Sequence, residues 1–445
     1  MTSVETVDAV VVGATVRGLV AAHVLSRLGQ RTVVVEPSSR LGGADGSFTT
    51  TRGHVFDHGL HVLDEMRSPT TTRLFRDVLG DRVRRTTLRR AIVLRGHVVP
   101  YAPAPDELPR ELRAMLPGDD LTDDISDALP TRSRLADCYG PAFADLVLDE
   151  VLPSYPTEAR HREFGVDEAR LLTNVYPWFF PRARRRSHVG DESRAFHDLL
   201  REGRAQTILY PEGGGFGRFP TALRDSCDPD LVEVLTGADD LHLDGSPGTH
   251  RIGEVRAGGR RFRSPRIFWG NGWAGLCREL GLPCQDVATD RVVLGSFALD
   301  RPPDLDVHEI LVGDPAFHLN RVHQPSAYRN TDDALLQVEF AFPLNDPRWP
   351  VDAATWRVRW EDDLRRLGVI GSAHGVVDFD FRSIVLHFNG FGAEGEPLRD
   401  ADPDLLGPES NVVPLAPSMA NLNLNRYVPR VIEAVTEAVA VGDRA

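Results

Sequence analysis

The chain opens with an apolar strand, a glycine-bearing turn, an apolar helix and a second apolar strand. Residues 7–12 are rich in valine, as is typical of a buried parallel strand, and residues 13–18 contain the turn. Residues 19–28 place apolar side chains at helical spacing. Residues 32–35 predict a second buried strand, which Glu36 closes. This compact βαβ unit predicts an α/β protein with a parallel sheet.

The turn reads Gly13-x-Thr15-x-x-Gly18, close to the G-x-G-x-x-G fingerprint of dinucleotide-binding domains. Gly13 permits a sharp turn, and Gly18 lets the helix pack closely on the strand. The helix N-terminus offers N–H groups and a positive dipole end to a pyrophosphate. Glu36 stands where a carboxylate accepts hydrogen bonds from an adenosine ribose. We therefore predict a cofactor site that contains Gly13, Ala14, Thr15, Gly18 and Glu36.

Thr15 replaces the middle glycine of the fingerprint. That glycine normally lets the backbone approach the pyrophosphate, and a β-branched side chain adds bulk there. Three outcomes stay open: the turn shifts, the threonine hydroxyl donates to phosphate, or cofactor affinity falls.

Two further segments favour FAD over NAD. Arg40-Leu41-Gly42-Gly43 follows Glu36 closely, and Phe56-Asp57-His58-Gly59-Leu60-His61 comes soon after. Together they resemble flavoproteins with two dinucleotide-binding domains, a group that includes protoporphyrinogen oxidase-like enzymes, amine oxidases, phytoene desaturases and UDP-galactopyranose mutases. The resemblance implies FAD as the cofactor. It also implies cofactor contacts at Arg40, Gly42, Gly43, Gly59, Leu60 and His61, the last three near the isoalloxazine.

Later segments resemble the same group in order and spacing. Residues 210–220 resemble its Y-P-x-G-G turn, and a strand at 231–235 would lead to an adenine contact at Ala238. Residues 421–433 resemble the closing flavin segment, which implies contacts at Asn423 and Leu424. A glycine usual before that segment is replaced by a proline-rich run at 414–418, and proline offers no N–H to a phosphate. Together with Thr15, this gives two weakened contacts to one pyrophosphate.

The chain contains no lysine, so all 51 of its Lys and Arg residues are arginine. A Schiff base and a lysine general base are therefore excluded. The lysine that holds water at the flavin in amine oxidases is excluded too, which argues against that activity. Arginine is well suited to a nucleotide diphosphate, and Arg321 and Arg382 lie in regions that loosely resemble those of the mutases. His61, Arg321 and Arg382 are the candidate catalytic residues.

The predicted architecture is an α/β fold with a discontinuous Rossmann-like FAD-binding domain, an inserted helical region and a mixed or antiparallel substrate sheet. We assign residues 1–62, 205–275 and 400–445 to the FAD-binding domain. Residues 63–204 are expected to form a mostly helical insertion with one strand of the substrate sheet. Residues 276–399 are expected to form the substrate-binding sheet domain, and the chain of 445 residues is long enough for these parts.

The net charge, the cysteine spacing and the length of the apolar runs limit the kinds of partner that we expect. A net charge of −14 argues against nucleic acid. The four cysteines lack C-x-x-C spacing, so we expect no metal site or disulfide framework and a reduced, cytoplasmic protein. No apolar run is long enough for membrane insertion. The expected partner is a small-molecule substrate, which a nucleotide sugar would satisfy, and a homodimer is a possible assembly.

Three functions stay open. The first is an FAD-dependent oxidoreductase, protoporphyrinogen oxidase-like, acting on a small organic or sugar-derived substrate. The second is a UDP-galactopyranose mutase-like isomerase that uses reduced FAD without net redox change. The third is a flavin-free, non-catalytic scaffold with the same fold.

Overall fold

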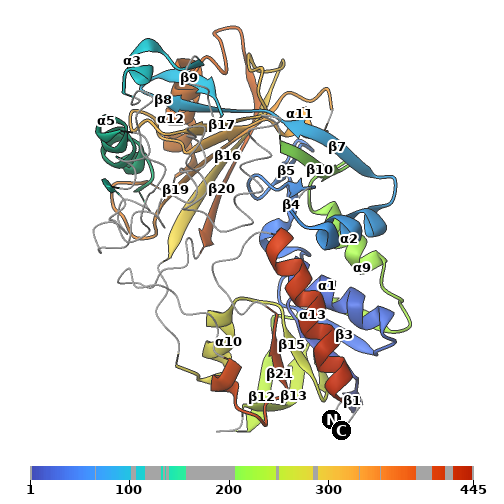
Figure 1. Cartoon of the computed structure of the whole chain (residues 1–445). Helices are drawn as coiled ribbons and strands as arrows, with labels where there is room; N and C mark the ends of the chain where they lie inside the picture. The colour runs from blue at the N-terminus through green and yellow to red at the C-terminus, as the bar shows by residue number, and fades with distance from the viewer. Residues whose placement is uncertain are drawn as a thin grey trace.

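The structure is a computed structural model that describes residues 3–65, 67–101, 107–115, 132–133, 136, 140–156, 206–246, 250–283, 289–329, 331–350, 352–386, 403–415 and 424–442. Two large sheets dominate it, one at each end of the molecule in Figure 1. The N-terminus and the C-terminus lie close together beside the first of them (Figure 1).

The first large sheet is the five-stranded sheet that the opening βαβ unit predicts. All its strands run parallel in the order β11-β3-β2-β15-β21. Their bounds are β2 Ala9–Val12, β3 Thr32–Glu36, β11 Val232–Thr236, β15 Ile267–Trp269 and β21 Val412–Pro414. Pro414 lies on edge strand β21, where a missing N–H costs no ladder bond on the outer side.

Both faces of this sheet are covered, which explains the valine-rich strands. Ala9 and Val11 pack under helices, whereas Val10 and Val12 pack against a second β layer. The helical layer consists of α1 Val16–Arg27, α2 Pro69–Leu79, α9 Arg218–Asp225 and α13 Leu424–Gly442. The β layer has the order β1-β14-β13-β12, with bounds β1 Val4–Thr6, β12 His242–Ser246, β13 Arg251–Ala257 and β14 Arg260–Arg263.

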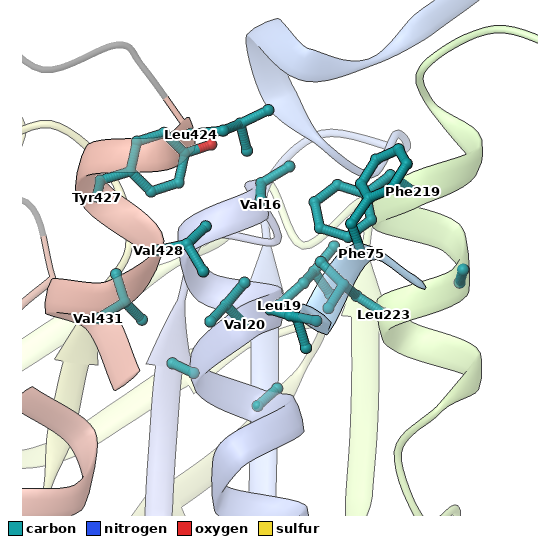
Figure 2. Packing of buried hydrophobic residues seen from close by; sticks show 14 of the residues in the cluster. Val16, Leu19, Val20, Phe75, Phe219, Leu223, Leu424, Tyr427, Val428 and Val431 are labelled. Atoms are coloured by element: carbon teal, nitrogen blue, oxygen red, sulfur yellow. The ribbon is translucent and has the colours of Figure 1, made fainter. Parts of the chain in front are cut away.

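Helix α1 is the centre of the helical layer. Figure 2 shows its Val16 and Val20 facing Leu424, Tyr427 and Val428 of α13. On the other side Leu19 meets Phe75 of α2 and the α9 residues Phe219 and Leu223 (Figure 2). The N-terminal ends of α1 and α13 therefore lie together at the top of the parallel sheet.

The second large sheet has seven strands in the order β20-β16-β19-β18-β17-β8-β9. All pairs are antiparallel except β17 with β8, so the sheet is mixed, as predicted. The strands are β8 Arg90–Leu94, β9 His97–Pro100, β16 Asp290–Leu299, β17 Glu309–Val312, β18 Arg321–His323, β19 Leu335–Pro343 and β20 Val376–Leu386. Helix α12, Ala353–Arg366, buries Trp356 and Trp360 in the core of this part.

Smaller elements lie between the two sheets in Figure 1. A hairpin joins β4 and β5, and a three-stranded sheet has the order β6-β10-β7. The strands are β4 Ser47–Thr49, β5 Val55–Asp57, β6 Leu63–Asp64, β7 Val83–Leu88 and β10 Gln206–Pro211. The remaining elements are η1 Gly43–Asp45, α3 Arg110–Arg113, α5 Pro141–Asp145, η3 Leu146–Val151, η4 Leu152–Ser154, α10 Trp273–Leu280, α11 Pro325–Arg329 and η6 Pro403–Leu406.

The structure differs from the sequence-based expectation in the region 63–204. This region contributes two strands to the seven-stranded sheet, β8 and β9, where one was expected.

Strand β20 runs from Val376 to Leu386. Its charged residues Asp380 and Arg382 alternate with Phe379 and Phe381, which pack on Phe297 and Trp360. This period-two alternation marks a strand that is buried on one face only.

Candidate functional site

The fingerprint turn depends on two glycines for its packing. Gly13 has a φ of +98°, which favours glycine, and a Cβ there would overlap the amide of Asn271. A Cβ on Gly18 would overlap the carbonyl oxygen of Gly13. The N–H of Gly13 donates to the carbonyl of Val35 at 2.7 Å, which ties the turn to β3. Both glycines are therefore needed where the sequence placed them.

Thr15 is the N-cap of α1. Its hydroxyl donates to the Gly270 carbonyl at 3.0 Å and accepts from the Gly18 N–H at 3.4 Å. Its methyl group lies beside Gly43, since a Cβ on that glycine would be 3.2 Å from Thr15 Cγ2. The single hydroxyl proton is therefore used by the protein backbone. The structure favours helix capping, a role outside the three outcomes that the sequence left open.

Glu36 and Ala238 lie together at the ends of β3 and β11. The Glu36 carboxylate accepts the Ala14 N–H at 2.8 Å and the Ser38 N–H at 2.9 Å. The Ala238 N–H donates to the Glu36 carbonyl at 3.1 Å. A carboxylate has about four acceptor positions, so Glu36 keeps capacity for ribose hydroxyls. The structure thus brings together Glu36 and Ala238, the two residues that were predicted to contact the adenosine.

The paired-glycine turn lies directly on the fingerprint turn. The Gly42 N–H donates to the Ala14 carbonyl at 2.8 Å, and Thr15 and Gly42 form an isolated parallel bridge. Gly42 and Gly43 have φ values of +92° and +59°. The side chain of Arg40 beside them is exposed. The two motifs thus form one continuous rim around the N-terminus of α1.

A polar cluster around Asp45 completes this rim, and sequence reasoning missed Asp45. Asp45 accepts a hydrogen bond from the Tyr427 hydroxyl at 3.0 Å, and His61 Nδ1 lies 3.6 Å from its other oxygen. Arg17 of α1 stacks on the Tyr427 ring at 4.7 Å. Burial raises the pKa of Asp45 above its usual range. Leu424 lies beside Tyr427 in Figure 2, whereas Asn423 lies outside the described residues.

His58 presents a buried, unpaired nitrogen near the predicted isoalloxazine position. Its Nδ1 has no hydrogen-bond partner among the residues that the structure describes. Burial, with help from Arg382, His61 and Arg40, lowers the pKa of His58 to about 4. The imidazole is therefore neutral at neutral pH, with an unused nitrogen for a ligand. The neighbouring His61 points Nε2 at the His58 carbonyl at 3.2 Å, so that nitrogen carries its proton.

The two candidate arginines lie on different strands of the seven-stranded sheet. Arg321 on β18 pairs with Glu309 at 2.9 Å and Glu339 at 3.1 Å. Arg382 on β20 pairs with Asp380 at 2.9 Å and stacks on Phe48 at 3.8 Å. Strands β16 and β19 separate them. The structure therefore does not place them as one two-arginine clamp.

A buried clamp joins the Y-P-E-G-G-G segment to the F-D-H-G-L-H segment. The Asp57 carboxylate accepts hydrogen bonds from the Tyr210 hydroxyl, the Phe216 N–H at 2.8 Å and Ser47 at 2.6 Å. Arg329 of α11 lies 3.3 Å from the same carboxylate. A Cβ on Gly215 would overlap the Ser47 side chain, so the glycine-rich turn is a packing requirement. The only sequence signal was the resemblance of each segment by itself.

Comparisons with known proteins agree with this geometry. Residues 11–78 match the model of the NAD(P)-binding Rossmann-like domain family. Over 77 residues, or 17% of the chain, the protein is 37% identical to all-trans-retinol 13,14-reductase of Rattus norvegicus, and this segment covers 12% of that protein. It is 31% identical over 77 residues to the inactive all-trans-retinol 13,14-reductase of Danio rerio, of which it covers 13%.

Solved structures match over nearly the whole chain. Reduced UDP-galactopyranose mutase has a TM-score of 0.69 and 15% identity, with 98% of this chain and 94% of that chain covered. A putative protoporphyrinogen oxidase from Exiguobacterium sp. 255-15 has a TM-score of 0.67 and 16% identity, with 100% of both chains covered. At such identities the likeness establishes the fold, and it confirms the predicted one.

The residues at the rim fit a dinucleotide. Gly42 and Gly43 carry no side chain where their loop meets the fingerprint turn, the Thr15 methyl lies beside Gly43, and His58 offers an unpaired polar atom. Glu36 lies at one end of this rim and Gly59 to His61 at the other, which is the order that the resemblance implies for an FAD site. Among the described residues, no helix has the length and hydropathy of a membrane span and no acidic, histidine or cysteine cluster suits a metal ion.

Proposed function

Because the chain has the fold of the mutase-like and oxidase-like flavoproteins, we propose that it is an FAD-dependent oxidoreductase acting on a small organic or sugar-derived substrate. One observation carries the proposal. Four segments within residues 13–61 and one more than 360 residues later line one continuous rim: Gly13–Gly18, Glu36, Gly42–Gly43, the His58–His61 stretch and the start of α13. The segment identity with a retinol reductase supports the reaction class.

In this proposal each part of the rim has a separate task. Glu36 and Ala238 hold the adenosine, and the N-terminus of α1 faces the pyrophosphate. When bound, FAD supplies the hydride-accepting chemistry. His58 offers Nδ1 to the ring or to the substrate. His61, fixed by the His58 carbonyl and Asp45, acts as a positioning group rather than as a free acid.

The visible spectrum of freshly purified protein tests the cofactor. We expect flavin absorption that is bleached by dithionite, and turnover of a reducing substrate should consume an oxidant. Protein that stays colourless after incubation with FAD would contradict the proposal and leave the flavin-free scaffold.

A mutase-like isomerase is the second candidate. The position of Arg382 beside His58 and Phe48 favours it, since an arginine next to the predicted ring could meet a diphosphate. The two ion pairs of Arg321 count against it. Activity on a nucleotide sugar that requires reduced flavin and consumes no oxidant would favour the isomerase over the oxidoreductase.

A further inference from the structure

Two side chains of β19 form hydrogen bonds with the backbone of residues 57–60, next to the predicted position of the flavin ring. Gln337 Nε2 donates to the Asp57 carbonyl at 2.9 Å, and Glu339 Oε1 accepts the Leu60 N–H at 2.8 Å. They are two residues apart on one strand, so both side chains project from the same face. Strand β19 therefore holds both ends of the four-residue segment 57–60 with hydrogen bonds of opposite polarity.

Gln337 has a single available orientation. Its Nε2 also donates to Ser296 on β16, so its Oε1 is the acceptor. His323 donates to that oxygen from Nε2 at 3.0 Å and accepts the Tyr328 hydroxyl proton at Nδ1. Ser296 and His323 are the cross-strand partners of Gln337 in the sheet, and all three side chains are buried. The amide cannot rotate without leaving buried groups unpaired.

Glu339 is held as a charged group. Burial by itself would raise its pKa, but Arg321, His323 and the Leu60 N–H together lower the pKa to about 2. Arg321, its cross-strand partner, pairs on its other side with Glu309, which also binds Arg90. The carboxylate that receives the Leu60 N–H is thus anchored through three further charged residues of the sheet, Arg321, Glu309 and Arg90.

Gly59 has the shape that this contact needs. Its φ is +109°, and a Cβ there would lie 3.2 Å from Glu339 Oε1. Glycine therefore lets the carboxylate reach the next peptide N–H.

We propose that Glu339 and Gln337 are positioning residues that fix the Gly59–Leu60 peptide against the flavin ring. This inference rests on the proposed function, because it assigns the segment 59–61 to the ring. The seven-stranded sheet thereby sets the electrostatic environment of the flavin through one hydrogen bond. A negative charge behind the Leu60 N–H disfavours added electron density on the ring, so it lowers the reduction potential.

The test compares Glu339→Ala and Glu339→Gln with Glu309→Gln. Both Glu339→Gln and Glu309→Gln remove one carboxylate from Arg321, but only Glu339 contacts Leu60. In the cofactor-free protein, Glu339→Ala should speed hydrogen–deuterium exchange in the peptide covering residues 57–62 by about tenfold, which corresponds to one lost hydrogen bond. Glu339→Gln keeps an acceptor and should exchange near the wild-type rate, as should Glu309→Gln.

The FAD-loaded proteins give the second readout. Glu339→Gln should shift the visible flavin band and move the reduction potential upward, whereas Glu309→Gln should change both less. Equal shifts in the two variants, or unchanged exchange in Glu339→Ala, would overturn the positioning role. If the wild type takes up no FAD, the proposed function fails, and the outcome is distinguishable because the exchange experiment needs no cofactor. Where Glu339→Ala does not fold, the Glu339→Gln and Glu309→Gln pair decides.

Discussion

The two ends of the cofactor rim are built in different ways. At the fingerprint turn, glycines and backbone groups within residues 13–43 make most of the contacts, with Gly270 and Asn271 as the distant additions. At the segment 57–61, buried side chains from β10 and α11 hold the Asp57 carboxylate, and two side chains of β19 hold the backbone. The first end is a local motif that many sequences can carry. The second depends on residues from distant parts of the chain, so substitutions far away in the sequence can change it.

The largest expected loss of stability follows substitution of Asp57, at the centre of the buried clamp. Asp57→Ala would leave Arg329 buried without its carboxylate and remove the acceptor for Tyr210 and the Phe216 N–H. Breaking a buried pair costs about 3–5 kcal/mol, so urea denaturation should show a loss of that size. A loss below about 1 kcal/mol would mean that the clamp does not hold the segment, and the contrast between the two ends would disappear.

The next largest loss of stability is expected at the fingerprint turn. Gly18→Ala places a Cβ against the Gly13 carbonyl, so α1 must shift, at a cost of about 1–3 kcal/mol for overpacking. Gly272→Ala is the matched control, because a Cβ there meets nothing within 4 Å. The same urea denaturation should find the control within about 0.5 kcal/mol of the wild type. Equal losses in both variants would contradict the packing argument.

Glu36→Ala tests whether one end of the rim binds the adenosine of FAD while the other end binds the flavin ring. It should weaken FAD binding by about 1–3 kcal/mol, through lost charge-assisted hydrogen bonds to the ribose. FMN lacks the adenosine, so its binding to the variant should change far less. Isothermal titration with both ligands measures this. Equal weakening for FAD and FMN would show that Glu36 acts only by holding the Ala14 and Ser38 N–H groups.

Substitutions of Thr15 test whether this residue, which replaces the middle glycine of the fingerprint, stabilises the protein as a helix N-cap. Thr15→Ala removes the acceptor for Gly18 and the donor for Gly270, and should lower stability by about 1 kcal/mol. Thr15→Ser keeps the hydroxyl and should stay close to the wild type in thermal melting. If Thr15→Ala is neutral in stability but loses FAD affinity, the hydroxyl is a phosphate ligand instead.

The smallest expected effect is a pH dependence of the Tm that comes from Asp45, which lies between the two ends of the rim. Its raised pKa means that the folded protein holds this proton more tightly than the unfolded chain. The corresponding stability is complete at low pH and is lost as the pH rises from 3.8 through the raised pKa. Asp45→Asn does not titrate, so its Tm should gain on the wild type over that range by on the order of 1–2 °C. A Tm difference that is constant with pH would exclude the effect.

The sequence predicted the fingerprint turn well, but it predicted poorly the contacts that hold the segment 57–61. Gly13, Gly18 and Glu36 follow from short-range geometry, and the structure places them as predicted. The Thr15 hydroxyl donates to a carbonyl 255 residues away, and the Asp57 carboxylate accepts from a tyrosine 153 residues away. Neither distance is visible in one sequence. Asp45 and Glu339 were missed for the same reason, since a single carboxylate in a loop or strand has no distinguishing pattern.

Titration of the cofactor-free protein with FAD tests the central claim most directly. We predict saturable binding of one FAD per chain, a shifted and structured flavin absorption band, and quenched flavin fluorescence as the ring settles beside His58 and the Gly59–Leu60 peptide. Absence of saturable binding, with the protein folded as judged by circular dichroism, would contradict the claim.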